Sequence, residues 1–181
     1  LLGPNMALAL GTTLGDLSLL RHAVLTSLAG VVTAMVLSAI IGVLMNVDPA
    51  LPELALRTQV RVGDVVLALA SGCAGALAFT SGVSATLIGV MVAVALLPPL
   101  VTFGLLLGGG YPILAMGALL LFLVNLICIN LAGVITFQIQ GIHPATWWEN
   151  DRATKATRIA LGLWVFLLVT LVSLILLMGN G

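Results

Sequence analysis

Long apolar runs, separated by short polar segments, follow one another along this chain. A helix needs roughly 20 apolar residues to cross a bilayer, and several runs approach that length. The pattern predicts an all-α polytopic transmembrane bundle, with five crossing helices and one partial helix. The crossing helices are predicted at 22–45, 64–79, 86–107, 111–138 and 159–178, and the partial helix at 1–14.

Composition supports the same class. The chain of 181 residues is 61% hydrophobic and only 7% charged, with a mean hydropathy of +1.29. A soluble domain averages roughly 25% charged residues, so lipid must cover this surface. We therefore expect a multi-pass protein of the cell membrane, the inner membrane in a bacterium. The net charge is zero, which gives no reason to expect nucleic acid as a partner.

Charged residues are concentrated in the two long loops, 46–64 and 141–158. The second loop carries Trp147 and Trp148 beside charged residues, which is typical of an interfacial amphipathic helix. Counting crossings places Arg21 and the basic residues of the second loop on one side, and Arg57 with Arg61 on the other. By the positive-inside rule, the first side is cytoplasmic.

The opening segment LLGPNMALALGTTLGD combines apolar residues with helix breakers. It has no initiator Met, no charged region and no cleavage site before it. We therefore expect a truncated N-terminus and a single transmembrane domain over 1–181.

A weak internal repeat divides that domain into 1–85 and 86–181. Sliding the chain by about 95 residues brings several residues onto identical ones. One period contains three crossings, an odd number, so the two copies would have opposite orientations in the membrane. That plan is the inverted repeat of many secondary transporters. The aligned pairs are Pro4 with Pro99, Gly15 with Gly110, Pro49 with Pro144, and Arg57 with Arg152.

The repeat pairs Gly3-Pro4 with Pro98-Pro99. Broken helices free backbone groups that lipid cannot satisfy, and transporters place solutes at such breaks near the midplane. Ordinary kinks, with no functional role, are the alternative interpretation. The transporter interpretation predicts a solute path lined by Gly3, Pro4, Asn5, Pro98, Pro99, Thr102 and Asn125.

Two amides, Asn125 and Asn130, sit in an apolar run and need partners. Five residues apart on a helix, they point in different directions and should serve different neighbours. Interhelical hydrogen bonding and lining of a solute path are both open. Asp16 and Asp64 adjoin glycines at predicted helix ends, where an interfacial position is favoured over proton coupling.

Catalytic and metal-site motifs are absent from the sequence. There is no H-E-x-x-H pair, no complete G-x-G-D or G-x-S-G motif, and no His pair at metal-ligand spacing. Cys73 and Cys128 lie in apolar runs and are interpreted as small hydrophobic residues. We expect no enzyme, no cofactor and no metal.

Two functions stay open. The first is a transporter or channel-like protein for a small polar or ionic solute. The second is a non-transporting membrane subunit or signalling module that acts through oligomerisation or a protein partner. Small residues that favour close helix contact make a homo-oligomer plausible; they are Ser71, Gly72, Gly75 and Gly82.

Three segments together resemble the domain of unknown function 389 family, uncharacterised hydrophobic membrane proteins of bacteria and archaea. These are LLGPNMALALGTTLGD, GVMVAVALLPPLVTFGLLL, and LVNLICINLAGVITF followed by GIHPATWW. The resemblance implies a membrane domain, often preceded by a cytoplasmic soluble region and by at least one further helix. It supplies no substrate and no catalytic residue.

Overall fold

The computed structural model describes residues 2–83, 85–142, 159 and 161–173, and every regular element within them is helical. The apolar stretch Leu161–Ser173 is helical as well. The six numbered helices are α1 (Leu2–Leu14), α2 (Leu17–Leu44), α3 (Pro52–Ala55), α4 (Val62–Thr80), α5 (Ala85–Gly108) and α6 (Pro112–Ile139).

Three helices, α2, α4 and α6, are long and apolar enough to span a membrane. This confirms the all-α fold and the expectation of membrane-spanning helices. The predicted runs 22–45, 64–79, 86–107 and 111–138 each fall on one helix. The run predicted at 159–178 lies only partly within the described residues.

The N-terminus of α2 lies at Leu17 rather than at His22, because Asp16 caps the helix. Its carboxylate accepts hydrogen bonds from the backbone N–H groups of Ser18 (2.9 Å) and Leu19 (3.1 Å), and from the Ser18 hydroxyl (2.8 Å). The Leu19 N–H first, and then the Ser18 hydroxyl, lower the pKa of this exposed carboxyl. Asp16 thus occupies a helix end, as its neighbouring glycine predicted.

The connection between α2 and α4 contains little helix. Helix α3 covers only four residues, and the chain then turns before α4. Asp64 fixes the start of α4, because its Oδ2 accepts a hydrogen bond from the Arg61 backbone N–H (2.8 Å) in a capping box. The predicted interfacial helix with Trp147 and Trp148 lies outside the described residues.

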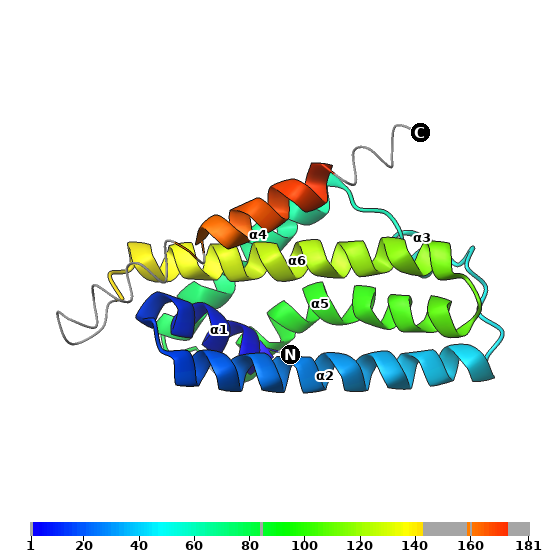
Figure 1. Ribbon diagram of the computed structural model, residues 1–181, viewed down its shortest axis with the longest axis horizontal. Coiled ribbons are helices and arrows are strands. Elements are labelled where there is room, and N and C mark those ends of the chain that lie inside the picture. The colour runs from blue at the N-terminus through cyan, green and yellow to red at the C-terminus, as the bar shows by residue number, and fades with distance from the viewer. Residues whose placement is uncertain (1, 84, 143–158, 160, 174–181) are drawn as a thin grey trace.

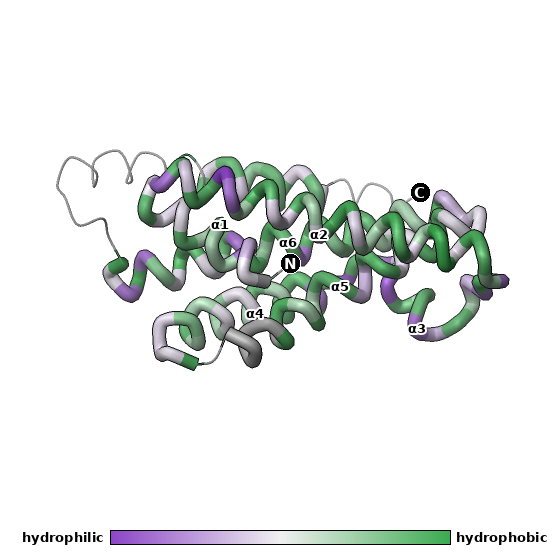
Figure 2. Tube along the Cα trace, turned by 90° about the horizontal axis from the view of Figure 1, so that it is seen from below, coloured by the Kyte–Doolittle hydropathy of each residue, from purple (hydrophilic) through white to green (hydrophobic). Residues whose placement is uncertain are grey.

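Helix α6 is the centre of the bundle. It contacts α1, α4 and α5, and 72% of its most apolar window is buried, against 11% for α2. Figure 1 shows α2 and α6 lying along the long axis and running in opposite directions. In Figure 2 the long helices are mostly hydrophobic, and hydrophilic residues gather largely in α3 and in the turns at the ends.

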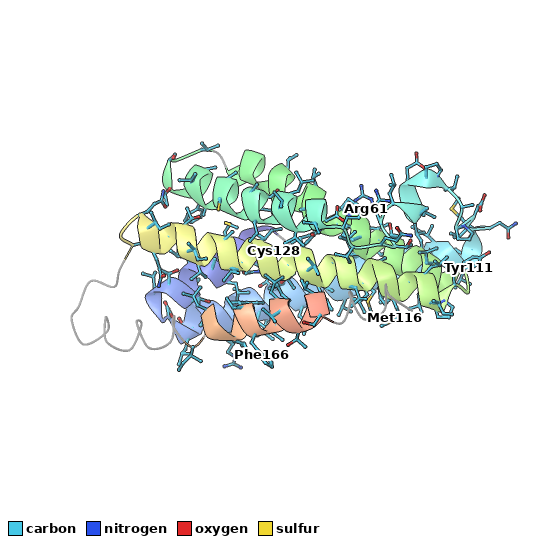
Figure 3. The ribbon with its side chains drawn as sticks, turned by 90° about the horizontal axis from the view of Figure 1, so that it is seen from above. Arg61, Tyr111, Met116, Cys128 and Phe166 are labelled. Atoms are coloured by element: carbon cyan, nitrogen blue, oxygen red, sulfur yellow. The ribbon has the colours of Figure 1, made fainter. Side chains whose placement is uncertain are left out.

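Much of the outer surface is apolar. Phe166 and Met116, which point away from the bundle in Figure 3, expose 66% and 50% of their surfaces. The exposed side of α2 carries a row of large aliphatic residues, including Val32, Val36 and Ile40. A water-exposed protein would not leave so large an apolar surface uncovered, so lipid is the solvent that fits it.

Small residues bring α2 and α5 into close contact. A Cβ atom added at Gly42 of α2 would collide with the Leu105 carbonyl of α5. Likewise, a Cβ at Gly104 would meet the Ser38 side chain, and one at Gly108 would meet the Ala39 carbonyl. This backbone-to-backbone contact depends on small residues because lipid provides no hydrophobic force that drives helices together.

Gly42→Ala is expected to destabilise the protein by about 1–3 kcal/mol, because α2 and α5 must separate to admit the methyl group. Thermal unfolding in detergent measures the effect. Gly63→Ala is the matched control, since a Cβ there meets nothing within 4 Å. Equal melting temperatures for the two variants would contradict the close contact.

Candidate functional site

Pro98 and Pro99 lie inside α5, which remains helical through both residues. Proline has no N–H group, so neither residue donates the usual helical hydrogen bond to the carbonyl four residues earlier. Those carbonyls belong to Val94 and Ala95. In a bilayer such groups need partners within the protein or in a water-filled cavity.

Asn125 of α6 supplies the missing donor for one of them. Its Nδ2 donates a hydrogen bond to the Ala95 carbonyl at 2.8 Å, although the two residues are 30 apart in the chain. The side chain is only 7% exposed, and its Oδ1 is buried without a hydrogen-bond partner. Asn125 therefore joins α6 to α5 and keeps an unused acceptor.

A cavity of about 280 Å³ lies beside this hydrogen bond. It is bounded by α4, α5, α6 and the turn before α4. The residues that give it its chemistry are Arg57, Asp64, Ser71, Val94, Ala95 and Asn125. Both carbonyls deprived of helical donors thus belong to residues on its wall.

The cavity extends from one end of the bundle toward its middle. Asp64 lies in the first turn of α4, whereas Ser71 lies about 10 Å further along the same helix at 1.5 Å per residue. Asn125 lies near the midpoint of α6, about 20 Å from Pro112. Asp64 therefore lies at the end of the cavity near the helix terminus, whereas Ser71 and Asn125 line its deeper part.

The residues predicted to line one solute path divide into two groups. Asn125 lines the cavity and bonds to the Ala95 carbonyl, which Pro99 leaves without its helical donor. Pro98 and Pro99 lie in α5 one turn further along and are not among the residues that line the cavity. Thr102 is buried in α5 but is not among the residues that line the cavity.

The opening segment forms a separate arrangement, and its role as a matched break stays a prediction. Helix α1 runs through Gly3 and Pro4, which are exposed and half-buried, and neither lines the cavity. Asn5 is buried, and its Oδ1 accepts a hydrogen bond from Asn130 Nδ2 at 3.1 Å.

The two amides of α6 serve different neighbours, which confirms the prediction from their spacing. Asn125 bonds to α5, whereas Asn130 bonds to α1 and also donates to the Leu126 carbonyl of its own helix at 2.8 Å. The Asn130 Oδ1 is buried and has no hydrogen-bond partner. Asn130 therefore joins α1 to the centre of the bundle.

Sequence reasoning missed Ser71 and the pair Arg57 and Asp64 as cavity residues. The available signal was the proline pair, since the residues four positions earlier are fixed by helix geometry. Which face of α4 would cover those carbonyls depends on packing that no local pattern encodes. Among the described residues, no group of three His, Cys, Asp or Glu side chains is placed to hold a metal ion.

Comparison with known proteins agrees with the resemblance seen in the sequence. A family model described as a domain of unknown function, DUF389, matches residues 1–131. An uncharacterised protein of Methanocaldococcus jannaschii is 40% identical over 176 residues, which cover 97% of this chain. The chain spans 55% of the length of that relative. No solved structure matches the chain.

The Asn125 hydrogen bond can be isolated by a double-mutant cycle. Asn125→Leu should cost about 1–3 kcal/mol, because it leaves the Ala95 carbonyl without its donor. Pro99→Ala restores a backbone N–H that can bond to Ala95, so Asn125→Leu should cost less in that background. Unfolding equilibria of the four proteins give the coupling energy, and strict additivity would contradict the assigned hydrogen bond.

Proposed function

Because the chain belongs to the family described as domain of unknown function 389, we propose its function from the cavity rather than from a relative. The proposed function is passage of a small polar or ionic solute across the membrane, as a transporter or a channel-like protein. The observation that carries it is the cavity beside the hydrogen bond from Asn125 to the Ala95 carbonyl, near the middle of the bundle.

A structural role alone does not account for this arrangement well. A kink needs its freed carbonyls satisfied, and Asn125 does this for Ala95. It does not need a cavity of about 280 Å³ beside the kink, nor a buried amide oxygen without a partner. Polar atoms at this depth cost free energy unless a ligand or water bonds to them.

The second support is an inverted repeat, which we propose from matching helix ends. Helices α2 and α6 each contain 28 residues and run in opposite directions (Figure 1). The turns before them contain Gly15 (φ 66°) and Gly110 (φ 84°), a left-handed conformation that favours glycine. Both glycines were paired by the sequence repeat.

The two turns also have the same pattern of backbone hydrogen bonds. In the first, Gly15 N–H donates to the Thr12 carbonyl (3.4 Å) and Asp16 N–H to the Gly11 carbonyl (3.0 Å). In the second, Gly110 N–H donates to Leu107 (3.3 Å) and Tyr111 N–H to Leu106 (2.8 Å). Every donor and acceptor in the second turn is the counterpart, in the repeat, of one in the first.

Helix packing follows the same relation. Gly104 of α5 lies against Ser38 of α2, and Gly133 of α6 lies against Ala9 of α1. The repeat pairs Gly104 with Ala9 and Ser38 with Gly133, so each contact is the counterpart of the other. Two copies related by a pseudo-two-fold axis would pack in this way, with the elements exchanged.

In the proposed mechanism, the cavity is one half of an alternating-access path. Its charged end lies on the side of Arg57, which the positive-inside rule assigns to the non-cytoplasmic face. Small movements of the two halves against each other would open the deep oxygen atoms to the other side. The proposal includes no enzymatic step and no cofactor; its partners are lipid, the solute and, from the small-residue helices, a second copy of the chain.

Flux through proteoliposomes tests the proposal. The full chain is reconstituted and electrogenic currents are recorded while a panel of solutes is applied, including alkali cations, small amines, amino acids and chloride. At least one gradient should produce a saturable current. In Asn125→Leu that current should fall about tenfold or more. The substitution removes the Asn125 amide from the cavity wall and leaves the Ala95 carbonyl without its donor.

Thr33→Val is the matched control, since Thr33 lies on the exposed side of α2 and bonds only to the Ala29 carbonyl of its own helix. Its current should equal that of the unmodified protein. Currents that Asn125→Leu leaves unchanged would remove the cavity from the path. No flux for any solute, together with co-purification of another protein at fixed stoichiometry, would favour the membrane subunit instead.

A further inference from the structure

The residues in the deep part of the cavity bring more hydrogen-bond acceptors than free donors. Ser71 and Asn125 bring side-chain polar groups, and Val94 and Ala95 are the residues whose carbonyls have no helical donor. The Ser71 hydroxyl donates to the Leu67 carbonyl at 2.7 Å, and one of the two N–H groups of the Asn125 Nδ2 donates to the Ala95 carbonyl. A ligand therefore meets mainly oxygen lone pairs.

The strongest member of this set is the Asn125 Oδ1. It is buried, it has no hydrogen-bond partner, and it belongs to a side chain that is more than nine-tenths buried on the cavity wall. The Val94 carbonyl receives no helical bond from Pro98, which has no N–H. Acceptors without donors bind a species that brings positive charge or N–H groups.

We propose that the deep cavity binds a small monovalent cationic group, either an alkali ion or the primary ammonium of a small organic solute. Both have the same chemistry toward this site, namely positive charge presented to neutral oxygen atoms. A primary ammonium carries three N–H donors, enough for Asn125, Val94 and Ser71 oxygens together. The inference rests on the cavity used for the proposed function and names its solute class.

Size and charge fit this class. The cavity of about 280 Å³ holds several molecules of water at about 30 Å³ each, so it has room for a partly hydrated ion or a methylammonium-sized solute. An anion would need several donors, and the lining residues offer only Arg57 and one N–H group of Asn125. Arg57 comes from the turn before α4 and lines the same cavity as Asp64, which lies about two turns of α4 from Ser71.

Substitutions of Arg57 and Asp64 test the sign of the charge that the cavity binds. Removing the positive charge with Arg57→Gln should tighten cation binding by about 2- to 10-fold, because a like charge is lost from the entrance. Asp64→Asn should weaken it by a similar factor, while an amide oxygen remains to accept the Arg61 N–H of the capping box. An anion site would respond in the opposite sense to both substitutions.

Combining Asn125→Leu with Pro99→Ala removes the Asn125 Oδ1 while the Ala95 carbonyl keeps a hydrogen-bond donor. In this double variant the backbone N–H of residue 99 can bond to the Ala95 carbonyl, so the helix keeps its hydrogen bond while the Asn125 Oδ1 is absent. Cation affinity should fall at least tenfold. Pro98→Ala supplies a donor to the Val94 carbonyl and should weaken binding as well.

Isothermal titration calorimetry of the full chain in detergent is the test, with Na⁺, methylammonium and acetate as separate titrants and a bulky organic cation as background salt. We expect saturable binding of Na⁺ or methylammonium. Binding of Na⁺ alone identifies an alkali ion site, and binding of methylammonium alone identifies an ammonium site. Thr33→Val should bind as the unmodified protein does.

The inference is overturned if neither cation binds, if the double variant binds as the unmodified protein does, or if acetate binds and Arg57→Gln weakens it. Because titration in detergent needs no translocation, its outcome is separate from the flux experiment. Cation binding without flux would contradict only the transport proposal. Flux of an anion without cation binding would contradict only the present inference.

Discussion

The hydrogen bond from Asn125 to the Ala95 carbonyl is the interaction on which the centre of the bundle depends. Two consecutive prolines remove two backbone donors from α5 at a depth where lipid offers none in exchange. The side chain of α6 restores one of them, which fixes the relative position of α5 and α6. The Asn125 Oδ1 is left buried without a hydrogen-bond partner, and that oxygen gives the cavity its chemistry.

Helix α6 can perform this role because it is held on several sides. Asn130 bonds to Asn5 of α1, and Gly72 of α4 lies against the Ile129 backbone. On the opposite side of the bundle, α2 and α5 meet through Gly42 and Gly104. The polar site is thus supported by close backbone contacts, and the apolar surface that remains outside is the surface that lipid covers.

The sequence predicted the helices well because crossing a bilayer demands long apolar runs that are easy to recognise. It also identified Pro98, Pro99 and Asn125 as unusual polar or helix-breaking groups in lipid. It did not predict that Asn5 would pair with Asn130, or that Arg57, Asp64 and Ser71 would join the cavity. Those relations depend on which helix faces meet, and nearly uniform hydrophobicity around each helix gives no local signal for that.

The central claim is that water reaches the cavity from outside the bilayer, and cysteine accessibility in liposomes tests it most directly. With Cys73 and Cys128 replaced by alanine, Ser71→Cys should react with a charged, water-soluble methanethiosulfonate. Val32→Cys, on the exposed apolar side of α2, should not react. Equal protection of both cysteines would mean that the cavity is closed to water, and the account of a solute site would be contradicted.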